Sequence, residues 1–170
     1  MIVWIIGLSG AGKTTLGRAL YRQWKAIEPA TVFVDGDDFR DIMGNDLGFS
    51  LEDREKNGKR LSKLCSFLDK QSINVVVSIL SNFPMHQQWN RENFSYYFEI
   101  FIDLPLAVLE RRDQKGLYSS FRAGTSEGVV GLDIPFKKPK FADLTISIED
   151  QTMPVEDLAK DILINHLKLR

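Results

Sequence analysis

An eight-residue glycine-rich segment near the N-terminus limits what this chain can fold into more than any other feature. Gly7–Thr14 reads GLSGAGKT and fits the pattern G-x-x-x-x-G-K-[ST]. The apolar run Ile2–Ile6 before it predicts a buried strand, and Leu16 and Leu20 after it have helical spacing. A loop in this context turns backbone N–H groups toward a phosphate, at the positive end of the helix dipole. The segment therefore predicts a nucleoside triphosphate site.

The residues of this loop have distinct expected roles. Lys13 is expected to contact the β- and γ-phosphates of ATP, and the Thr14 hydroxyl to hold Mg²⁺. The remaining loop contacts to ATP are expected from Gly7, Ser9, Gly10, Ala11, Gly12 and Thr15. The structural alternative is a chance glycine turn before a helix, which the intact strand–loop–helix context disfavours.

Apolar runs without strict alternation recur along the chain and predict strands that are buried on both faces of a parallel sheet. They are Ile2–Ile6, Thr31–Val34, Ile73–Leu80, Phe98–Ile102 and Leu144–Ile148. Stretches with helical spacing separate or follow them: Lys13–Lys25, Leu51–Lys70, Gln87–Tyr97, Leu106–Arg112 and Val155–Leu169. This alternation predicts an α/β fold, a three-layer P-loop sandwich around a five-stranded parallel sheet.

Composition narrows the class of protein. A chain of 170 residues and 19.4 kDa suits one domain over residues 1–170. Its 22 Lys and Arg nearly balance 23 Asp and Glu, which argues against nucleic acid or an anionic membrane as a partner. No apolar run reaches the roughly 20 residues of a membrane span. The single cysteine, Cys65, is expected to be a buried small hydrophobe, so we expect a soluble cytoplasmic protein.

Acidic residues follow the second predicted strand. Asp35, Asp37 and Asp38 lie where a parallel strand ends, and carboxylates at that edge sit beside the nucleotide crevice. Asp35 is expected to join Thr14 in holding the metal, and Asp37 (or Asp35) to accept the proton of an attacking hydroxyl. The alternative is an acidic turn that caps a helix. No N-K-x-D motif is present, so guanine recognition of the GTPase type is not expected.

A second polar group precedes and enters the predicted helix Leu51–Lys70. Ser50 or Asp53 is expected to cap this helix, so that Arg54 and Asn57 lie on neighbouring turns. Arginine forks suit phosphate-like anions, and Phe49 offers an aromatic face for a base. The alternative is a solvated helix face with Arg–Glu pairs.

Glycines and prolines interrupt residues 115–140, which show no clear period and predict a flexible lid. Arg111, Arg112 and Lys115 at its start could neutralise charge on ATP as a lid closes, or could complement the dipole at a helix end.

Together these residues resemble the adenylylsulfate (APS) kinase family, which phosphorylates the ribose 3′-hydroxyl of APS with MgATP. The matching strings run in order along nearly the whole chain: Gly7–Thr15, Asp35–Asp37 with Arg40, Asp46–Ser50 with Asp53, Arg54 and Asn57, Phe101–Pro105, Arg112–Tyr118, and Gly131, Asp133 and Pro135. The resemblance implies ATP and Mg²⁺ as cofactors, a small nucleotide acceptor and a homodimer.

The resemblance also implies site residues. Arg112 would contact ATP, and the acceptor would be bound by Asp37, Arg40, Phe49, Arg54, Asn57, Ser81, Lys115 and Leu132. Some family members carry a phosphoserine at the position of Ser81, although direct transfer to the acceptor is the simpler mechanism.

Departures from the family pattern fall on the acceptor side. Pro84 stands where the family string I-S-P-[YF]-R has its arginine, and Val129 and Val130 replace the F-T that helps to sandwich adenine. Ser119 and Ser120 replace a usual basic pair. Losing a stacking face and positive charge favours a smaller base and a less anionic head group. The pattern resembles the family's cytidine diphosphoramidate kinase branch, of capsular phosphoramidate synthesis.

Three other functions remain open at this point. The chain could be a true APS kinase, a nucleotide-binding regulatory module without catalysis, or a kinase for a non-nucleotide metabolite such as a sugar acid. Phe49 beside Arg54 and Asn57 favours a nucleotide acceptor. His86 and His166 have no partners at metal-ligand spacing, so both are expected at the surface.

Overall fold

The computed structural model describes residues 1–113 and 115–169. Within them a five-stranded parallel sheet has the order β2-β3-β1-β4-β5. The strands are β1 (Ile2–Gly7), β2 (Thr31–Asp35), β3 (Asn74–Ile79), β4 (Tyr97–Ile102) and β5 (Leu144–Ile146). The predicted five-stranded parallel α/β sheet is therefore confirmed.

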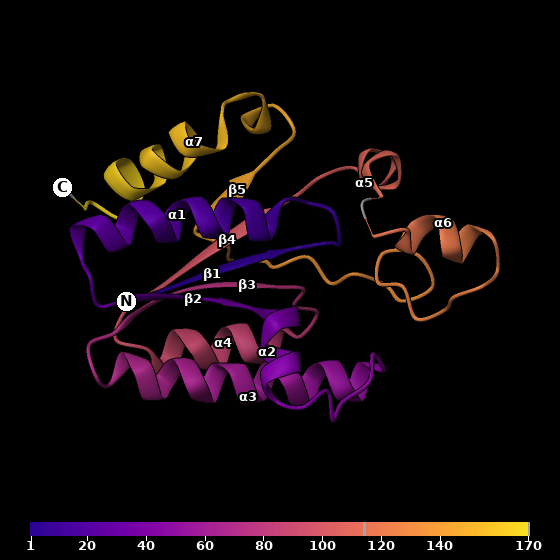
Figure 1. Cartoon of the computed structure of the whole chain (residues 1–170), viewed down its shortest axis with the longest axis horizontal. Coiled ribbons are helices and arrows are strands. Elements are labelled where there is room, and N and C mark those ends of the chain that lie inside the picture. Colours follow the sequence, from indigo (N-terminus) through magenta and orange to yellow (C-terminus); the bar gives the residue numbers. More distant parts are fainter. Residues whose placement is uncertain (114, 170) are drawn as a thin grey trace.

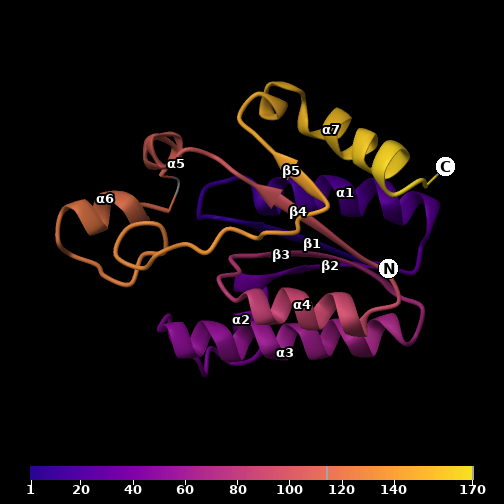
Figure 2. The same ribbon diagram turned by 180° about the vertical axis from the view of Figure 1, so that it is seen from behind.

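Helices cover both faces of the sheet, which gives the three layers (Figure 1). On one face lie α1 (Lys13–Ile27) and α7 (Val155–Asp161), the latter continued by a π-helical turn over Ile162–His166. On the other lie α3 (Leu51–Asp69) and α4 (Pro84–Asn93), which contact each other. The view from behind shows the same division (Figure 2).

The central strand β1 explains why two separate cores form. Successive side chains of a strand point to opposite faces. Val3 and Ile5 pack in the core under α1 and α7, whereas Ile2, Trp4 and Ile6 pack in the core under α3. Cys65 of α3 is fully buried in the second core, as expected, and burial raises the pKa of its thiol.

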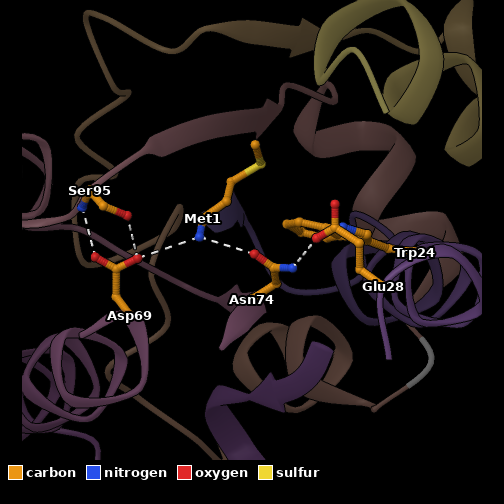
Figure 3. Close-up of polar contacts among 6 residues, drawn as sticks. All are labelled: Met1, Trp24, Glu28, Asp69, Asn74 and Ser95. Atoms are coloured by element: carbon orange, nitrogen blue, oxygen red, sulfur yellow. Dashed lines mark hydrogen bonds and ion pairs between the residues drawn. The ribbon is translucent and has the colours of Figure 1, made fainter. Parts of the chain in front are cut away.

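Polar contacts tie the elements together at the end of the sheet where β1 begins (Figure 3). The Met1 ammonium donates to Asp69 Oδ1 at 3.4 Å and to Asn74 Oδ1 at 3.1 Å. Asp69 accepts two more hydrogen bonds from Ser95, and Asn74 donates to Glu28 at the end of α1. The opposite end of the sheet, where the strands finish, is left for the glycine-rich loop and its partners.

Two predicted helices have other bounds. The helix expected over residues 87–97 is α4 (Pro84–Asn93), because Pro84 is well suited to the first turn and Tyr97 already pairs with Ile2 in the sheet. The helix expected over 155–169 leaves α-helical geometry after Asp161.

The expected lid is more ordered than its sequence indicates. Two short helices lie beyond the end of the sheet (Figures 1 and 2): α5 (Leu106–Arg112), which precedes the expected lid, and α6 (Leu117–Arg122), which lies within it. The absence of regular structure predicted for residues 115–140 is therefore wrong at α6. Tyr118 and Val129 within the segment are buried in the core under α1, which explains this order.

Candidate functional site: a glycine-rich loop and an arginine-rich cluster

The glycine-rich loop leaves the middle of the sheet, because it connects β1 to α1. Gly10 has φ 76° and Gly12 φ 99°, in the left-handed region that favours glycine. Gly7 packs so closely that a Cβ there would lie 2.9 Å from the Ile102 carbonyl oxygen. Gly12 is the N-cap of α1, and the first N–H groups of a helix have no intrahelical acceptor. The loop thus presents backbone donors at a helix start, as an anion site requires.

Lys13 extends back along this loop. Its Nζ donates to the Leu8 carbonyl oxygen at 2.7 Å. Burial lowers the pKa of Lys13 to about 8, although Asp37 and Asp35 nearby oppose the shift. An anion bound in the loop would strengthen the protonated form, since an opposite charge at close range favours the charged state.

Asp35 performs two tasks at the end of β2. Its Oδ2 accepts a hydrogen bond from the Thr14 hydroxyl at 2.7 Å, and its Oδ1 caps helix α2 (Gly36–Ile42) through the Asp37 N–H at 3.0 Å. The helix-cap interpretation is therefore confirmed for Asp35, whose other oxygen faces Thr14. No cluster of three or more His, Cys, Asp or Glu able to hold a metal occurs in the described ranges. Thr14 and Asp35 offer two hard oxygen ligands, which suit Mg²⁺ when phosphate and water supply the rest.

Asp37 meets the lid segment. Lys115 Nζ lies 2.5 Å from Asp37 Oδ2, and this hydrogen bond raises the pKa of Lys115. Both side chains are well exposed. The structure thus brings together residues from α2 and from the turn before α6, far apart in the sequence.

The predicted base platform is built from Phe49 and two arginines. The guanidinium carbons of Arg40 and Arg54 lie 5.0 and 5.4 Å from the centre of the Phe49 ring. Arg40 donates to the Gly48 carbonyl at 2.8 Å, and Arg54 donates to Phe49 O at 2.8 Å and to Gly128 O at 3.4 Å. Burial and the neighbouring Arg40 lower the pKa of Arg54, which marks a place rich in positive charge.

Asn57 lies one turn after Arg54 on α3, and Ser81 follows β3. Their residues are 3% and 5% exposed, but neither is among the described side chains with a fully buried, unpartnered polar atom. Ser50 caps α3 by accepting from the Asp53 N–H at 3.1 Å, as one of the two expected caps. Part of α3 has the solvated ion pairs of the alternative interpretation, since Lys56 pairs with Glu52 at 2.8 Å on this helix. Arg60 pairs instead with Asp46, which lies before α3.

Three other predicted site residues make no side-chain hydrogen bond to the glycine-rich loop among the residues that the structure describes. Leu132 is half-buried against the core under α1, and Thr15 is exposed at the start of α1. Arg112 is exposed in the last turn of α5, and no hydrogen bond joins it to the loop in the described part of the chain. That position equally suits the alternative of complementing the helix dipole.

Two residues that contact the loop had no role in the sequence interpretation. Tyr118 donates its hydroxyl to Ser9 O at 2.9 Å, and Gln151 donates to Ala11 O at 2.9 Å. Tyr118 stands in a matching string, but nothing in the sequence indicates which atom it touches. Gln151 lies 140 residues from its partner, so only the fold brings them together.

The sequence model of the adenylylsulphate kinase family matches residues 1–147. The chain belongs to this family. It is an ATP-dependent kinase, a phosphotransferase with an alcohol group as acceptor.

Relatives within the family differ in the acceptor that they are named for. An adenylyl-sulfate kinase of Synechococcus sp. (strain JA-2-3B'a(2-13)) is 37% identical and covers 99% of this chain and 94% of its own. A cytidine diphosphoramidate kinase of Campylobacter jejuni is 38% identical, over 86% of this chain and 85% of its own. The solved structure of the Mycobacterium tuberculosis APS kinase with AMPPNP and APS is 34% identical, with a TM-score of 0.84 over 95% of this chain and 94% of that one.

The residues that depart from the family pattern have structural roles here. Asn82 follows Ser81 and is 3% exposed. It donates to Pro135 O at 2.9 Å and accepts from the Lys137 N–H at 2.6 Å, so it ties the loop after β3 to the lid segment. Val129 and Val130 are 1% and 3% exposed and provide no open aromatic face.

The surface position expected for His86 is wrong. His86 is buried, and the centres of its ring and the Phe83 ring are 5.4 Å apart. It also lies beside Gly58, where an added Cβ would be 2.8 Å from His86 Nδ1. Gly58 therefore leaves the space that the imidazole fills. His166 is half-exposed. Over the described ranges, no helix combines the length and apolar character needed to cross a membrane.

Proposed function

We propose that this kinase transfers the γ-phosphate of ATP to the ribose 3′-hydroxyl of a nucleotide, and that the acceptor is cytidine diphosphoramidate. The observation that carries the proposal is the cluster of Phe49, Arg40 and Arg54. The exposed Phe49 ring has the guanidinium carbons of Arg40 and Arg54 at 5.0 and 5.4 Å from its centre, and Arg54 also donates to the carbonyl of Gly128. The next residue along that loop is the buried Val129.

A single stacking face suits a pyrimidine better than a purine. Base–aromatic stacking contributes about 1–3 kcal/mol per base, so losing the second face would cost a large adenine more than a small cytosine. Pro84 stands in place of an arginine, which removes a charge-assisted contact to an anionic head group. A terminal phosphoramidate carries one negative charge, as a terminal sulfate does, but it has an NH2 donor where the sulfate has an acceptor oxygen. It therefore needs fewer cationic donors around it, in keeping with this loss.

The donor half of the mechanism uses the loop. Lys13 and the loop N–H groups would hold the β- and γ-phosphates, with further contacts from Arg112. Mg²⁺, held by Thr14 and Asp35, would supply charge neutralisation at the phosphate oxygens. The short Thr14–Asp35 contact supports this pairing.

The acceptor half uses Asp37 as the general base. Asp37 would take the proton of the 3′-hydroxyl as that oxygen attacks phosphorus in line, and the bond from phosphorus to the ADP oxygen breaks. Arg40, Arg54, Asn57 and Ser81 would orient the acceptor, and Lys115 would close over the transferred group. Asn57 lies one turn after Arg54 on α3, and this position supports its role beside that arginine.

The test is a coupled assay of ADP release with MgATP and three arms: cytidine diphosphoramidate, APS, and no acceptor. We expect turnover with cytidine diphosphoramidate and no turnover when its 3′-deoxy analogue replaces it as the acceptor. Turnover with APS alone would instead establish the second candidate, a true adenylyl-sulfate kinase, which the retained Phe49 and its arginines favour. ATP binding without turnover on any acceptor would establish the non-catalytic module.

Two further proposals concern the whole chain. We propose that residues 1–170 act as one kinase unit, because strands from residue 2 to residue 146 form one sheet. We also propose a homodimer, on the family resemblance. Light scattering on the purified protein decides between one and two copies.

A further inference from the structure

Three carbonyl groups of the phosphate loop each accept a hydrogen bond from a side chain. Leu8 O accepts from Lys13, Ser9 O from Tyr118, and Ala11 O from Gln151. Tyr118 belongs to α6 and Gln151 to a 3₁₀ turn (Asp150–Thr152), so two of the three donors come from outside the loop.

These contacts decide where the loop's N–H groups point. A trans peptide holds its C=O and N–H in opposite directions. The described residues contain no cis peptide bond, so fixing Ser9 O on one side turns the Gly10 N–H to the other. Gln151 acts in the same way on the peptide that joins Ala11 to Gly12. Glycine at positions 10 and 12 makes peptide rotation easy, so an outside restraint is needed to select one orientation.

Tyr118 is itself held firmly. Its ring is 2% exposed in the core under α1, and burial raises the pKa of its hydroxyl to about 12, so it remains a donor at neutral pH. The start of α6 is fixed by Asp113, whose carboxylate accepts from the N–H groups of Tyr118 and Ser119 at 2.9 and 2.8 Å.

The same turn carries Lys115 to the acceptor side. Lys115 lies three residues before Tyr118 and contacts Asp37 at 2.5 Å. The segment from Lys115 to Tyr118 thus contacts the proposed base through Lys115 and the phosphate loop through Tyr118.

We propose that Tyr118 is a positioning residue: its hydroxyl fixes the Ser9–Gly10 peptide so that the Gly10 N–H faces the phosphates, and it aligns the turn that places Lys115 against Asp37. The proposal rests on the assignment of the loop to ATP and of Lys115 to the acceptor side. It does not depend on which acceptor is used.

The test is the Tyr118→Phe variant, which keeps the buried ring and removes only the hydroxyl. Binding of Mg²⁺-AMPPNP is measured by calorimetry without acceptor. We expect binding to weaken about 3- to 10-fold, the effect of losing one neutral hydrogen bond. The matched control is Tyr21→Phe, because Tyr21 accepts a hydrogen bond from Lys25 on α1 away from the loop and should leave binding unchanged.

Two further variants separate the two effects of Tyr118. Gln151→Met should weaken Mg²⁺-AMPPNP binding similarly while leaving kcat near the wild-type value, because the hydrogen bond of its side chain goes to Ala11 O and, among the described residues, not to Lys115, Gly116 or Leu117. In a Lys115→Met background, Tyr118→Phe should still weaken nucleotide binding but should no longer lower kcat. A double-mutant cycle gives this coupling directly.

The proposal is overturned if Tyr118→Phe binds Mg²⁺-AMPPNP within about twofold of wild type. It is also overturned if the loss of binding free energy is matched by an equal loss of unfolding free energy in the protein without nucleotide. Tyr118 would then act only as a core residue. A wild-type protein that binds no Mg²⁺-AMPPNP overturns this proposal and the ATP site together. Binding without turnover on any acceptor overturns only the proposed reaction.

Discussion

The Asp35 carboxylate accepts a hydrogen bond from the Thr14 hydroxyl at 2.7 Å while its other oxygen caps α2. One side chain therefore joins the phosphate loop to the helix that carries Asp37. Its electrostatic role and its structural role can be separated by experiment, because asparagine caps helices about as well as aspartate.

Asp35→Asn should fold with nearly wild-type stability and bind Mg²⁺ weakly. We expect the Mg²⁺ concentration for half-maximal activity to rise by about tenfold or more, since a hard divalent cation prefers carboxylate oxygen. A Mg²⁺ titration of turnover and a thermal melt check the two parts. The control is Asp38→Asn on the exposed side of α2, and an equal rise there would contradict the assignment.

Asp37→Asn should lower kcat by about 10²- to 10⁴-fold, the usual contribution of a general base. Binding of Mg²⁺-AMPPNP should change little at pH 7 or below, where Lys13 stays protonated without Asp37, because the proposed contact of Asp37 is with the acceptor. Single-turnover kinetics with saturating acceptor give the chemical step. Wild-type turnover in this variant would remove Asp37 from the base role.

Nucleotide binding should weaken as pH rises through about 8, because burial lowers the pKa of Lys13 to that value and phosphate needs the ammonium form. The affinity should be constant at lower pH, where Lys13 is already charged. Binding near pH 8 should take up a proton, and calorimetry in buffers of different ionisation enthalpy measures this. Lys13→Met should abolish the pH step, and its persistence would assign the step to another group.

The same pKa affects folding with the opposite sign. The unfolded lysine, with a pKa near 10.5, binds more protons than the folded one between about pH 8 and 10.5. This group alone therefore makes stability rise with pH across that window. Comparing urea denaturation of wild type and Lys13→Met at pH 7.5 and 9.5 isolates its contribution.

Pro84→Arg restores the cation that the family pattern expects after β3. The ratio of kcat/KM for APS to that for cytidine diphosphoramidate should rise by about tenfold, as a new charge-assisted contact predicts. Pro84→Met has a similar length without charge and serves as the control. An equal change in both variants would point to the loss of proline at the start of α4 and not to the charge.

Gly58→Ala should destabilise the fold, although alanine is the better helix former by about 1 kcal/mol. The added Cβ would lie 2.8 Å from His86 Nδ1 in a buried site. In a His86→Ala background the same change should become stabilising. Urea denaturation of the four proteins in this cycle gives the sign, and destabilisation in both backgrounds would refute the steric explanation.

The glycine-rich loop and the parallel sheet could be predicted because their signals are local. The G-x-x-x-x-G-K-[ST] pattern and the apolar runs each depend on neighbouring residues only. The end of α4 could not be placed, since the aromatic residues around Tyr97 suit a helix or a strand, and pairing with β1 decides between them.

The sequence indicated the candidate residues on the acceptor side, but it did not indicate the long-range hydrogen bonds around them. Asn82, Tyr118 and Gln151 make their contacts across 53 to 140 residues of sequence. The buried state of His86 also depends on a distant partner, Gly58. Such contacts follow from packing in three dimensions and leave no periodic trace in the chain.

The glycine-rich loop follows directly after β1, and β1 is hydrogen-bonded on one side to β3 and on the other to β4. Amide protons in such a central strand exchange with solvent only when the whole fold opens. Those of α6, a six-residue helix beyond the sheet, can exchange through local opening. The Tyr118 hydroxyl therefore links the loop that follows this central strand to a helix that is expected to open locally. Nucleotide binding should slow exchange in α6 through this contact, and in β1 because it stabilises the whole fold against opening.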